Sequence, residues 1–180
     1  MEAPEEPEEP GFWLPIFGGG SPFSDVHPDD WFFDPVSALA SEYILDGYPD
    51  GTFRPQNNVT YGEALKLVLM AADYDYQEPT GSHWASGYQS KALEDGILSG
   101  AVNLDAPIDR LAMAHLAAKA LGIAPSSDLT AFADCKDGYV EALYEHYILE
   151  GSFVNGVRVY QPGSHLTRAE FAAIIYRISR

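Results

Sequence analysis

The sequence has little cysteine and little positive charge, and these two absences exclude several classes of protein. The single cysteine, Cys135, cannot form an internal disulfide framework. Ten Lys and Arg residues against 27 Asp and Glu residues give a formal net charge of −17 and a sequence pI of about 4.3. Such acidity argues against general nucleic-acid binding and against a basic amphipathic membrane anchor. We therefore expect no nucleic-acid partner.

The chain also lacks a long apolar run and the usual signatures of catalytic and metal sites. No apolar run approaches the roughly 18–20 residues that a membrane-spanning helix needs, so we expect no membrane insertion. The five His residues lack a zinc-site spacing, and there is no glycine-rich phosphate loop and no serine elbow. Carboxylates are too numerous for any pair to stand out as a general acid and base. The sequence therefore predicts no enzyme, no metal site and no cofactor.

Two local features are better explained by structure than by chemistry. Tyr48-Pro49-Asp50-Gly51 is typical of a tight turn. Considered as a calcium loop from Asp46, the segment has Gly51 in the sixth position but an unsuitable Asn57 in the twelfth, which disfavours calcium. Cys135 is predicted to be a small buried thiol, because nothing fixes His146 on the following helix in contact with it as a base.

Residues 1–20 are predicted to be an acidic linker rich in proline and glycine. Met1 to Pro10 consists almost entirely of Glu and Pro, which cannot bury apolar surface and favour an extended, disordered chain. This composition is the opposite of a secretory signal, and we expect the native chain to extend further upstream. The apolar island from Phe12 to Phe17 either docks on the domain as a clip or is a remnant of the linker.

A helix-start pattern near the C-terminus occurs three times along the chain. Thr167 can cap the first amides of a helix, Glu170 can reach back to the amide of the cap, and Leu166 and Phe171 suit a hydrophobic staple. An apolar residue, a capping oxygen and an apolar helix face recur, and three such matches in order indicate an internal repeat. The three predicted helices span Thr60–Ala72, Asp109–Leu121 and Thr167–Ser179.

Three sets of residues upstream of these helices align and complete the repeat. They are Val36, Leu39, Ala40, Tyr43, Ile44 and Gly47, then Gln89, Ala92, Leu93, Gly96, Ile97 and Gly100, and then Val140, Leu143, Tyr144, Tyr147, Ile148 and Gly151. Each unit is therefore a helix, a loop of variable length and a second helix. Units of about fifty residues are too small to bury a core alone, so we expect one cooperative domain. It consists of unit 1 (residues 21–78), unit 2 (79–128) and unit 3 (129–180).

The chain resembles a triplet of S-layer homology (SLH) modules over residues 21–180. The resemblance rests on Phe23-Ser24-Asp25-Val26, Trp31, the segment from Gly47 to Pro55 that reads GYPDGTFRP, and Thr167-Arg168-Ala169-Glu170. Phe132-Ala133-Asp134 opens unit 3 as Phe23-Ser24-Asp25 opens unit 1. The four-residue signature at Thr167 is complete only in unit 3. Unit 3 in turn lacks the tryptophan that the other units carry at Trp31 and Trp84.

For the fold we expect an all-α domain of three helix-loop-helix SLH repeats. Six main helices should form three helical hairpins in an approximate, or pseudo-, three-fold arrangement. The second helix of each unit should be heavily buried, and the loops should project outward and form grooves between neighbouring units. Val154 to Tyr160 alternates around Asn155-Gly156, which predicts a small two-stranded ribbon in the loop of unit 3.

Arg110 and Arg168 are the principal candidate site residues. Each is predicted at the first helical position, where the helix amides and dipole favour an anion and a guanidinium adds a bidentate fork for a carboxylate. A salt bridge to one of the many acidic residues is the alternative. The resemblance implies that these arginines hold an anionic, often pyruvylated, secondary cell-wall polysaccharide, and we expect Arg168 to dominate. Tyr61, at the third such position, carries no charge.

Four further residues complete the candidate glycan-binding set. Trp31 and Trp84 each precede a helix, and a role as a core wedge is favoured over a groove-lining ring that packs on sugar C–H groups. Glu170 is expected to cap its helix first and to contact ligand second. Arg54 belongs to the turn that carries the resemblance.

The resemblance implies a non-catalytic module that anchors a larger secreted protein to a bacterial cell wall. We expect an extracellular location at the wall, and as partners the wall polysaccharide and covalently linked upstream domains. A protein–protein assembly module whose diverged repeats no longer bind glycan is the first alternative. A glycan hydrolase is the second, but it would need an acid and a base across a cleft, and the sequence selects none.

Overall fold

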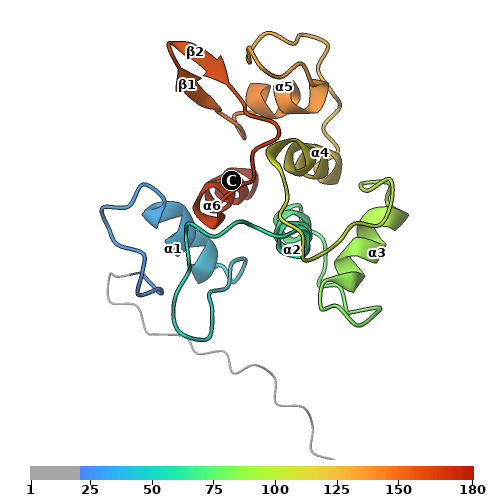
Figure 1. The fold of residues 1–180 in the computed structure, drawn as a ribbon. Helices are drawn as coiled ribbons and strands as arrows, with labels where there is room; N and C mark the ends of the chain where they lie inside the picture. The colour runs from blue at the N-terminus through green and yellow to red at the C-terminus, as the bar shows by residue number, and fades with distance from the viewer. Residues whose placement is uncertain (1–20) are drawn as a thin grey trace, which may run out of the picture.

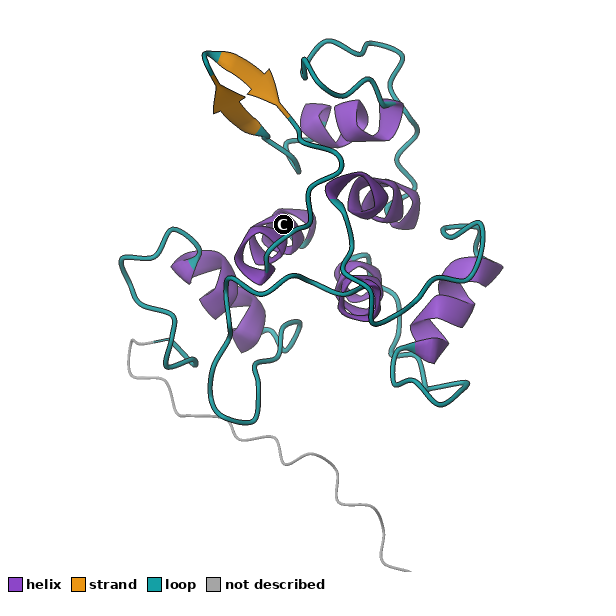
Figure 2. Cartoon of the chain, viewed as in Figure 1, coloured by secondary structure: helices purple, strands orange, loops and turns teal. Residues whose placement is uncertain are grey.

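The computed structural model of the chain describes residues 21–180, which form six helices and one two-stranded ribbon. The predictions of a linker and a clip within residues 1–20 lie outside the described residues. The helices are α1 (Phe33–Ser41), α2 (Tyr61–Ala71), α3 (Ser86–Glu94), α4 (Arg110–Ala120), α5 (Gly138–Glu145) and α6 (Arg168–Ile178). The strands β1 (Ser152–Val154) and β2 (Val157–Val159) pair antiparallel, which confirms the predicted ribbon (Figure 2). None of the described helices is long and apolar enough to cross a membrane.

The second helix of each unit begins at the predicted capping residue. Thr60, Asp109 and Thr167 are the N-caps of α2, α4 and α6, and the side chain of each accepts a hydrogen bond from an amide of the first helical turn. At Thr60 and Thr167, a glutamate reaches back to the cap amide and completes a capping box. The sequence therefore determines these three helix starts locally.

The first helix of each unit ends at a residue with a left-handed backbone. These residues occupy the same place in the repeat and are Tyr43 (φ 59°), Gly96 (φ 70°) and Tyr147 (φ 61°). After each tyrosine, the amide of the following isoleucine donates to a carbonyl of the last helical turn, which closes the helix with a Schellman motif.

The two helices of a unit do not pack against each other, so the predicted helical hairpins were wrong. Instead α1 packs on α6, α3 on α2 and α5 on α4, while α2 lies against both α4 and α6 (Figure 1). The first helix of each unit therefore covers the second helix of another unit. The second helices are apolar on more than one face, and this exchange covers them from outside while α2 also packs on α4 and α6 near the centre (Figure 1).

Backbone hydrogen bonds join the N-termini of α2, α4 and α6 in a closed ring. The first two amides of each helix donate to the segment that precedes another: those of α6 to Asn57 and Pro55, those of α2 to Ala106 and Leu104, and those of α4 to Ser164 and Pro162. An isolated β-bridge accompanies each of these contacts. Each of these second helices, which we call the central helices, thus has its first two amides accepted by another unit.

All six helices contribute to one hydrophobic cluster. Cys135 lies in it with 6% of its surface exposed, which confirms the predicted buried thiol, and burial raises the pKa of that thiol. A single shared core is consistent with one cooperative domain.

The Phe-x-Asp motif that opens units 1 and 3 holds a backbone turn. In both units the aspartate carboxylate accepts hydrogen bonds of 2.7 and 2.8 Å from two successive amides: Asp25 from Phe53 and Arg54, and Asp134 from Tyr160 and Gln161. The second amide belongs in each case to a residue with positive φ. These turns place Phe53 and Tyr160 under the two arginines described next.

Candidate functional site

Two pockets lie where residues of different units meet. The first, of about 270 Å³, is lined by Leu45, Asp46, Gly47, Tyr48, Phe53, Val59, Glu63, Lys66, Leu67, Trp84, Arg168 and Phe171. The second, of about 150 Å³, is lined by Trp31, Arg110, Leu149, Glu150, Gly151, Glu170, Ala173, Ile174 and Arg177. We call them the Arg168 pocket and the Arg110 pocket. Both are smaller than the roughly 300–1,000 Å³ pockets that enclose a drug-sized ligand. Each therefore suits only a small part of a longer ligand.

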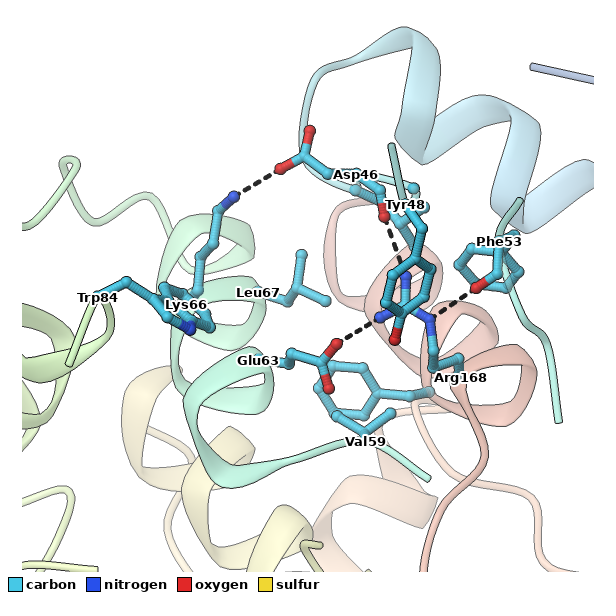
Figure 3. Close-up of a pocket in the computed structure, with 12 residues that line it drawn as sticks. Asp46, Tyr48, Phe53, Val59, Glu63, Lys66, Leu67, Trp84 and Arg168 are labelled. Atoms are coloured by element: carbon cyan, nitrogen blue, oxygen red, sulfur yellow. Dashed lines mark hydrogen bonds and ion pairs between the residues drawn. The ribbon is translucent and has the colours of Figure 1, made fainter. Parts of the chain in front are cut away.

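Arg168 forms one side of its pocket and Trp84 the opposite side (Figure 3). All three guanidinium nitrogens have partners: Nε donates to the carbonyl of Phe53 at 2.8 Å, Nη2 to that of Asp46 at 3.0 Å, and Nη1 to Oε1 of Glu63 at 2.6 Å. The rings of Phe53 and Tyr48 lie 4.8 and 5.0 Å from the guanidinium carbon. With 8% of its surface exposed, Arg168 is a largely enclosed cation.

The rest of the Arg168 pocket is an apolar floor with a polar rim. Leu67 lies between Trp84 and Arg168 (Figure 3). At the rim, Nζ of Lys66 pairs with Oδ2 of Asp46 at 2.7 Å. The imidazole of His83 accepts the amide of Ala85 through Nδ1 and lies 5.5 Å, centre to centre, from the indole of Trp84. The pocket therefore offers an exposed indole face opposite a buried guanidinium.

The Arg110 pocket is built from the same kinds of side chain. Nε of Arg110 donates to the carbonyl of Tyr160 at 2.8 Å, and Nη1 lies 3.3 Å from Oε1 of Glu170. The Tyr160 ring lies 5.1 Å from the guanidinium carbon, and its hydroxyl donates to the carbonyl of Arg110. Nη2 of Arg177 pairs with Glu150 at 2.9 Å, and Trp31 lines the pocket from unit 1.

The two pockets correspond position by position in the repeat. Arg168, Glu63 and Trp84 in one have the places of Arg110, Glu170 and Trp31 in the other, and each set comes from three different units. Each pocket holds two cations and two carboxylates, so it is formally neutral in a chain of net charge −17. At the third set of positions, Tyr61 replaces the arginine and Ala112 the glutamate. Burial raises the pKa of the Tyr61 phenol, which stays uncharged at neutral pH.

The structure corrects two expectations about these residues. Trp31 and Trp84 are 63% and 48% exposed, so the favoured core-wedge role was wrong, and the groove-lining arrangement is the one observed. The N-terminal amides beside Arg110 and Arg168 are not available to an anion, because carbonyls of another unit already accept them. The indoles stay outside because the core positions before α1 and α3 are filled by the neighbouring Phe32 and Ala85.

Arg54 lies next to the Arg168 pocket but does not line it. Its guanidinium pairs with Asp50 at 2.9 Å and lies 3.8 Å from the centre of the Tyr48 ring. The guanidinium of Arg168 lies against the same ring. Hydrogen bonds from Thr52 and Arg54 lower the pKa of Asp50 to about 2. Arg54 thus orients a residue of the pocket.

The lining residues that were not predicted as site residues include Glu63, Lys66, Arg177 and Tyr48. Glu63 is half of the capping box at Thr60, and its second oxygen also binds Arg168. Lys66 and Arg177 are partly exposed residues of α2 and α6, and in the sequence they look like ordinary surface cations. Tyr48 lies in the predicted turn. Glu63 and Tyr48 are revealed by their contacts with Arg168 of another unit. Lys66 and Arg177 pair within their own units, and only their place in the pocket linings reveals them.

Comparison with known proteins identifies a family for one segment. Residues 22–65 match the S-layer homology domain. The chain is similar to a surface layer protein of Brevibacillus choshinensis, at 38% identity over 82 residues, which are 45% of this chain and 7% of the relative. It is also similar to a middle cell wall protein of Brevibacillus brevis, at 40% identity over 73 residues, 40% of this chain and 7% of the relative.

A third relative matches most of the chain. An uncharacterized cell wall amidase of Bacillus anthracis is 31% identical over 168 residues, which are 85% of this chain and 31% of that protein. The chain therefore spans less than a third of the length of each of these relatives. Together the matches indicate a bacterial protein located at the cell surface or cell wall, and they support a cell-wall anchoring module.

Proposed function

We propose that this chain, whose residues 22–65 match an S-layer homology domain, consists of three such repeats and anchors a larger protein to the cell wall by binding an anionic secondary cell-wall polysaccharide. One observation carries the proposal. An arginine–glutamate pair faces an exposed tryptophan in two corresponding pockets, each assembled from three units. A pyruvylated glycan is the form of ligand that we propose to test first.

The ring of hydrogen bonds between the central helices supports the pseudo-three-fold arrangement. Each central helix receives the same two backbone contacts from the segment before another. The outer helices link the same pairs of units: α1 of unit 1 packs on α6 of unit 3, α3 of unit 2 on α2 of unit 1, and α5 of unit 3 on α4 of unit 2. An arrangement of this kind places equivalent grooves between units, of which two keep the full set of side chains.

The chemistry of the pockets suits a charged saccharide. An exposed indole packs on the C–H face of a sugar, and a guanidinium offers two parallel donors to a carboxylate. A ligand carboxylate can take the place of Glu63 or Glu170 beside the arginine. The neutral balance of each pocket and screening over about 8–10 Å at physiological salt reduce repulsion from the acidic surface.

We propose no catalytic step in these pockets. Both glutamates are held by an arginine, and each also accepts the cap amide of its own helix. A general acid must present its proton to the scissile bond, whereas both oxygens of each glutamate already accept hydrogen bonds within the chain. Glu63 and Glu170 therefore serve as structural partners of the arginines.

The test is sedimentation of the purified protein with cell-wall sacculi, before and after chemical removal of the secondary polysaccharide. Binding to intact sacculi that is lost after stripping supports the proposal. Equal binding to stripped sacculi, or binding only to other wall proteins, would favour the assembly-module alternative. Turnover of the wall glycan would instead reveal an enzyme.

A further inference from the structure

We propose that the two pockets are unequal, and that the Arg110 pocket is the stronger anion site, with Arg177 as its second anion contact. For the class of ligand this rests on the proposed function. The ranking of the two pockets rests on differences between their corresponding atoms. It reverses the expectation that Arg168 dominates binding.

The first difference is the number of guanidinium nitrogens already in use. Nε, Nη1 and Nη2 of Arg168 all donate within the chain. Arg110 donates from Nε and Nη1, and among the described residues its Nη2 has no hydrogen-bond partner. The Nη1 contact of Arg110 is also the longer, at 3.3 Å against 2.6 Å. An incoming carboxylate therefore displaces less at Arg110.

The second difference is the cover over the arginine. In unit 1 the turn after Gly47 places Tyr48 against Arg168, and the carbonyl of Asp46 accepts its Nη2. In unit 3 the corresponding loop is longer and continues as the ribbon β1–β2, so Ser152 follows Gly151 where Tyr48 follows Gly47. Within the described residues, the Arg110 guanidinium lies against one aromatic ring, that of Tyr160, whereas Arg168 lies against two.

The third difference is the second cation. Arg177 in α6 lies at the position that Met70 has in α2, and it lines the Arg110 pocket. Its partner Glu150 has a side chain 70% exposed, and its other contact, to the carbonyl of Ile148, is long at 3.4 Å. Such a surface pair is weak, so a ligand carboxylate can compete with Glu150 for Arg177.

The Arg168 pocket has a lysine as its second cation. Lys66 lies on the earlier turn, where α6 has Ala173, and is held by Asp46 at 2.7 Å. A lysine is a compact, strongly hydrated point charge, whereas two guanidiniums can each bind a carboxylate through two parallel donors. The floor of the Arg168 pocket is also the more apolar, with Leu67, Val59 and Phe171. We infer that an anionic group is taken by the Arg110 pocket at lower concentration.

Each pocket carries its own spectroscopic reporter, because Trp31 lines one and Trp84 the other. In protein carrying Trp13→Phe and labelled with 5-fluorotryptophan, these two residues give two ¹⁹F signals, assigned by Trp31→Phe and Trp84→Phe. The probe is a purified pyruvylated oligosaccharide, and the same oligosaccharide without its pyruvyl group is the control. The Trp31 signal should titrate at about tenfold lower concentration than the Trp84 signal.

Two variants test the assignment of Arg177. Arg177→Met introduces the residue that α2 has at the corresponding position, Met70. It should raise the midpoint of the Trp31 titration about tenfold and leave the midpoint of Trp84 unchanged, and Arg177→Lys should give an intermediate Trp31 midpoint. The matched Lys66→Ala should shift only the Trp84 midpoint. Simultaneous titration, an earlier Trp84 signal, or a Trp31 midpoint unaffected by Arg177→Met would overturn the inference. If neither signal moves while the protein still sediments with intact sacculi, the ranking is wrong but wall anchoring stands; if sedimentation fails too, the proposed function fails.

Discussion

At the scale of single residues, the glutamates of the two pockets illustrate how one side chain serves two partners. Oε2 of Glu170 accepts the amide and hydroxyl of Thr167, while Oε1 faces Arg110. Glu63 divides its oxygens in the same way between Thr60 and Arg168. The helix cap and the pocket are therefore linked through a single carboxylate.

Replacing each glutamate by glutamine separates these two roles. A glutamine can still complete the capping box, but it carries no charge for the arginine. Glu63→Gln should lower the free energy of unfolding by about 1.5–3 kcal/mol, because Arg168 is enclosed and its 2.6 Å contact is lost. Glu170→Gln should cost less than about 1 kcal/mol, since its contact is longer and half-exposed. Urea denaturation of both variants measures the difference, and equal losses would refute it.

A second prediction at this scale concerns acid stability. Burial raises the pKa of Asp134, but hydrogen bonds from the amides of Tyr160 and Gln161 outweigh it and lower the pKa below the ordinary value. A lowered folded-state pKa stabilises the protein above the unfolded pKa of about 3.9, and the stabilisation is lost as pH falls through the folded value.

Asp134→Asn should therefore be less stable than the wild type at pH 7 and pH 5, with a difference that shrinks below about pH 4. Denaturant titrations at a series of pH values give this difference directly. Asp128→Asn is the control, because within the described residues the Asp128 carboxylate has no hydrogen bond. A difference that stays constant down to pH 2.5 would contradict the role of Asp134.

The sequence predicted site residues well when their role was local and poorly when it was not. Thr60, Asp109 and Thr167 could be recognised as caps because a cap bonds to its own first turn. The placement of Trp31 and Trp84 could not, because a tryptophan before a helix fits a core or a rim equally well. What decides is which of two adjacent residues takes the core position, and here Phe32 and Ala85 take it.

At the scale of elements, the ends of the first helices carry backbone strain in two units and none in the third. Gly96 accepts a left-handed backbone without steric cost, whereas Tyr147 adopts the same conformation with a Cβ. Such a conformation costs a non-glycine residue roughly 1–2 kcal/mol. The side chain of Tyr147 is 85% exposed, so little packing offsets that cost.

Exchanging the two residue types should therefore have opposite effects. Tyr147→Gly should raise the free energy of unfolding by about 0.5–1 kcal/mol, the relief of strain being partly offset by the greater freedom of glycine in the unfolded chain. Gly96→Ala should lower it by a similar amount, although no atom lies within 4 Å of the added Cβ. Thermal unfolding of both proteins tests the pair. A destabilised Tyr147→Gly protein would show that the exposed ring has a packing role.

The pairing of the elements was the part of the fold that the sequence could not provide. Apolar periodicity identified α2, α4 and α6, including their ends, because the pattern belongs to each helix alone. It did not say which helix covers which face. A short hairpin within each unit and an exchange between units satisfy the same pattern, and the exchange prevails because it buries each central helix against elements of other units.

At the scale of the whole molecule, the exchange makes every unit incomplete without another. The outer helix α1 of unit 1 rests on α6 of unit 3, although the two are far apart in the sequence. The Arg168 pocket likewise combines side chains of all three units. Folding and the proposed wall binding are therefore expected to be lost together when one unit is removed.

Deletion of residues 129–180 tests this dependence. The deletion removes α5 and α6, so α1 loses the helix on which it packs and α4 loses α5. It also opens the ring, because the amides of α4 lose the carbonyls of Ser164 and Pro162. The remaining chain should then expose the apolar faces of α1, α2 and α4, and it should be molten or aggregate. Amide NMR spectra and thermal unfolding are the measurements: poorly dispersed resonances and a broad transition are expected, whereas a sharp transition with dispersed resonances would mean that two units fold independently.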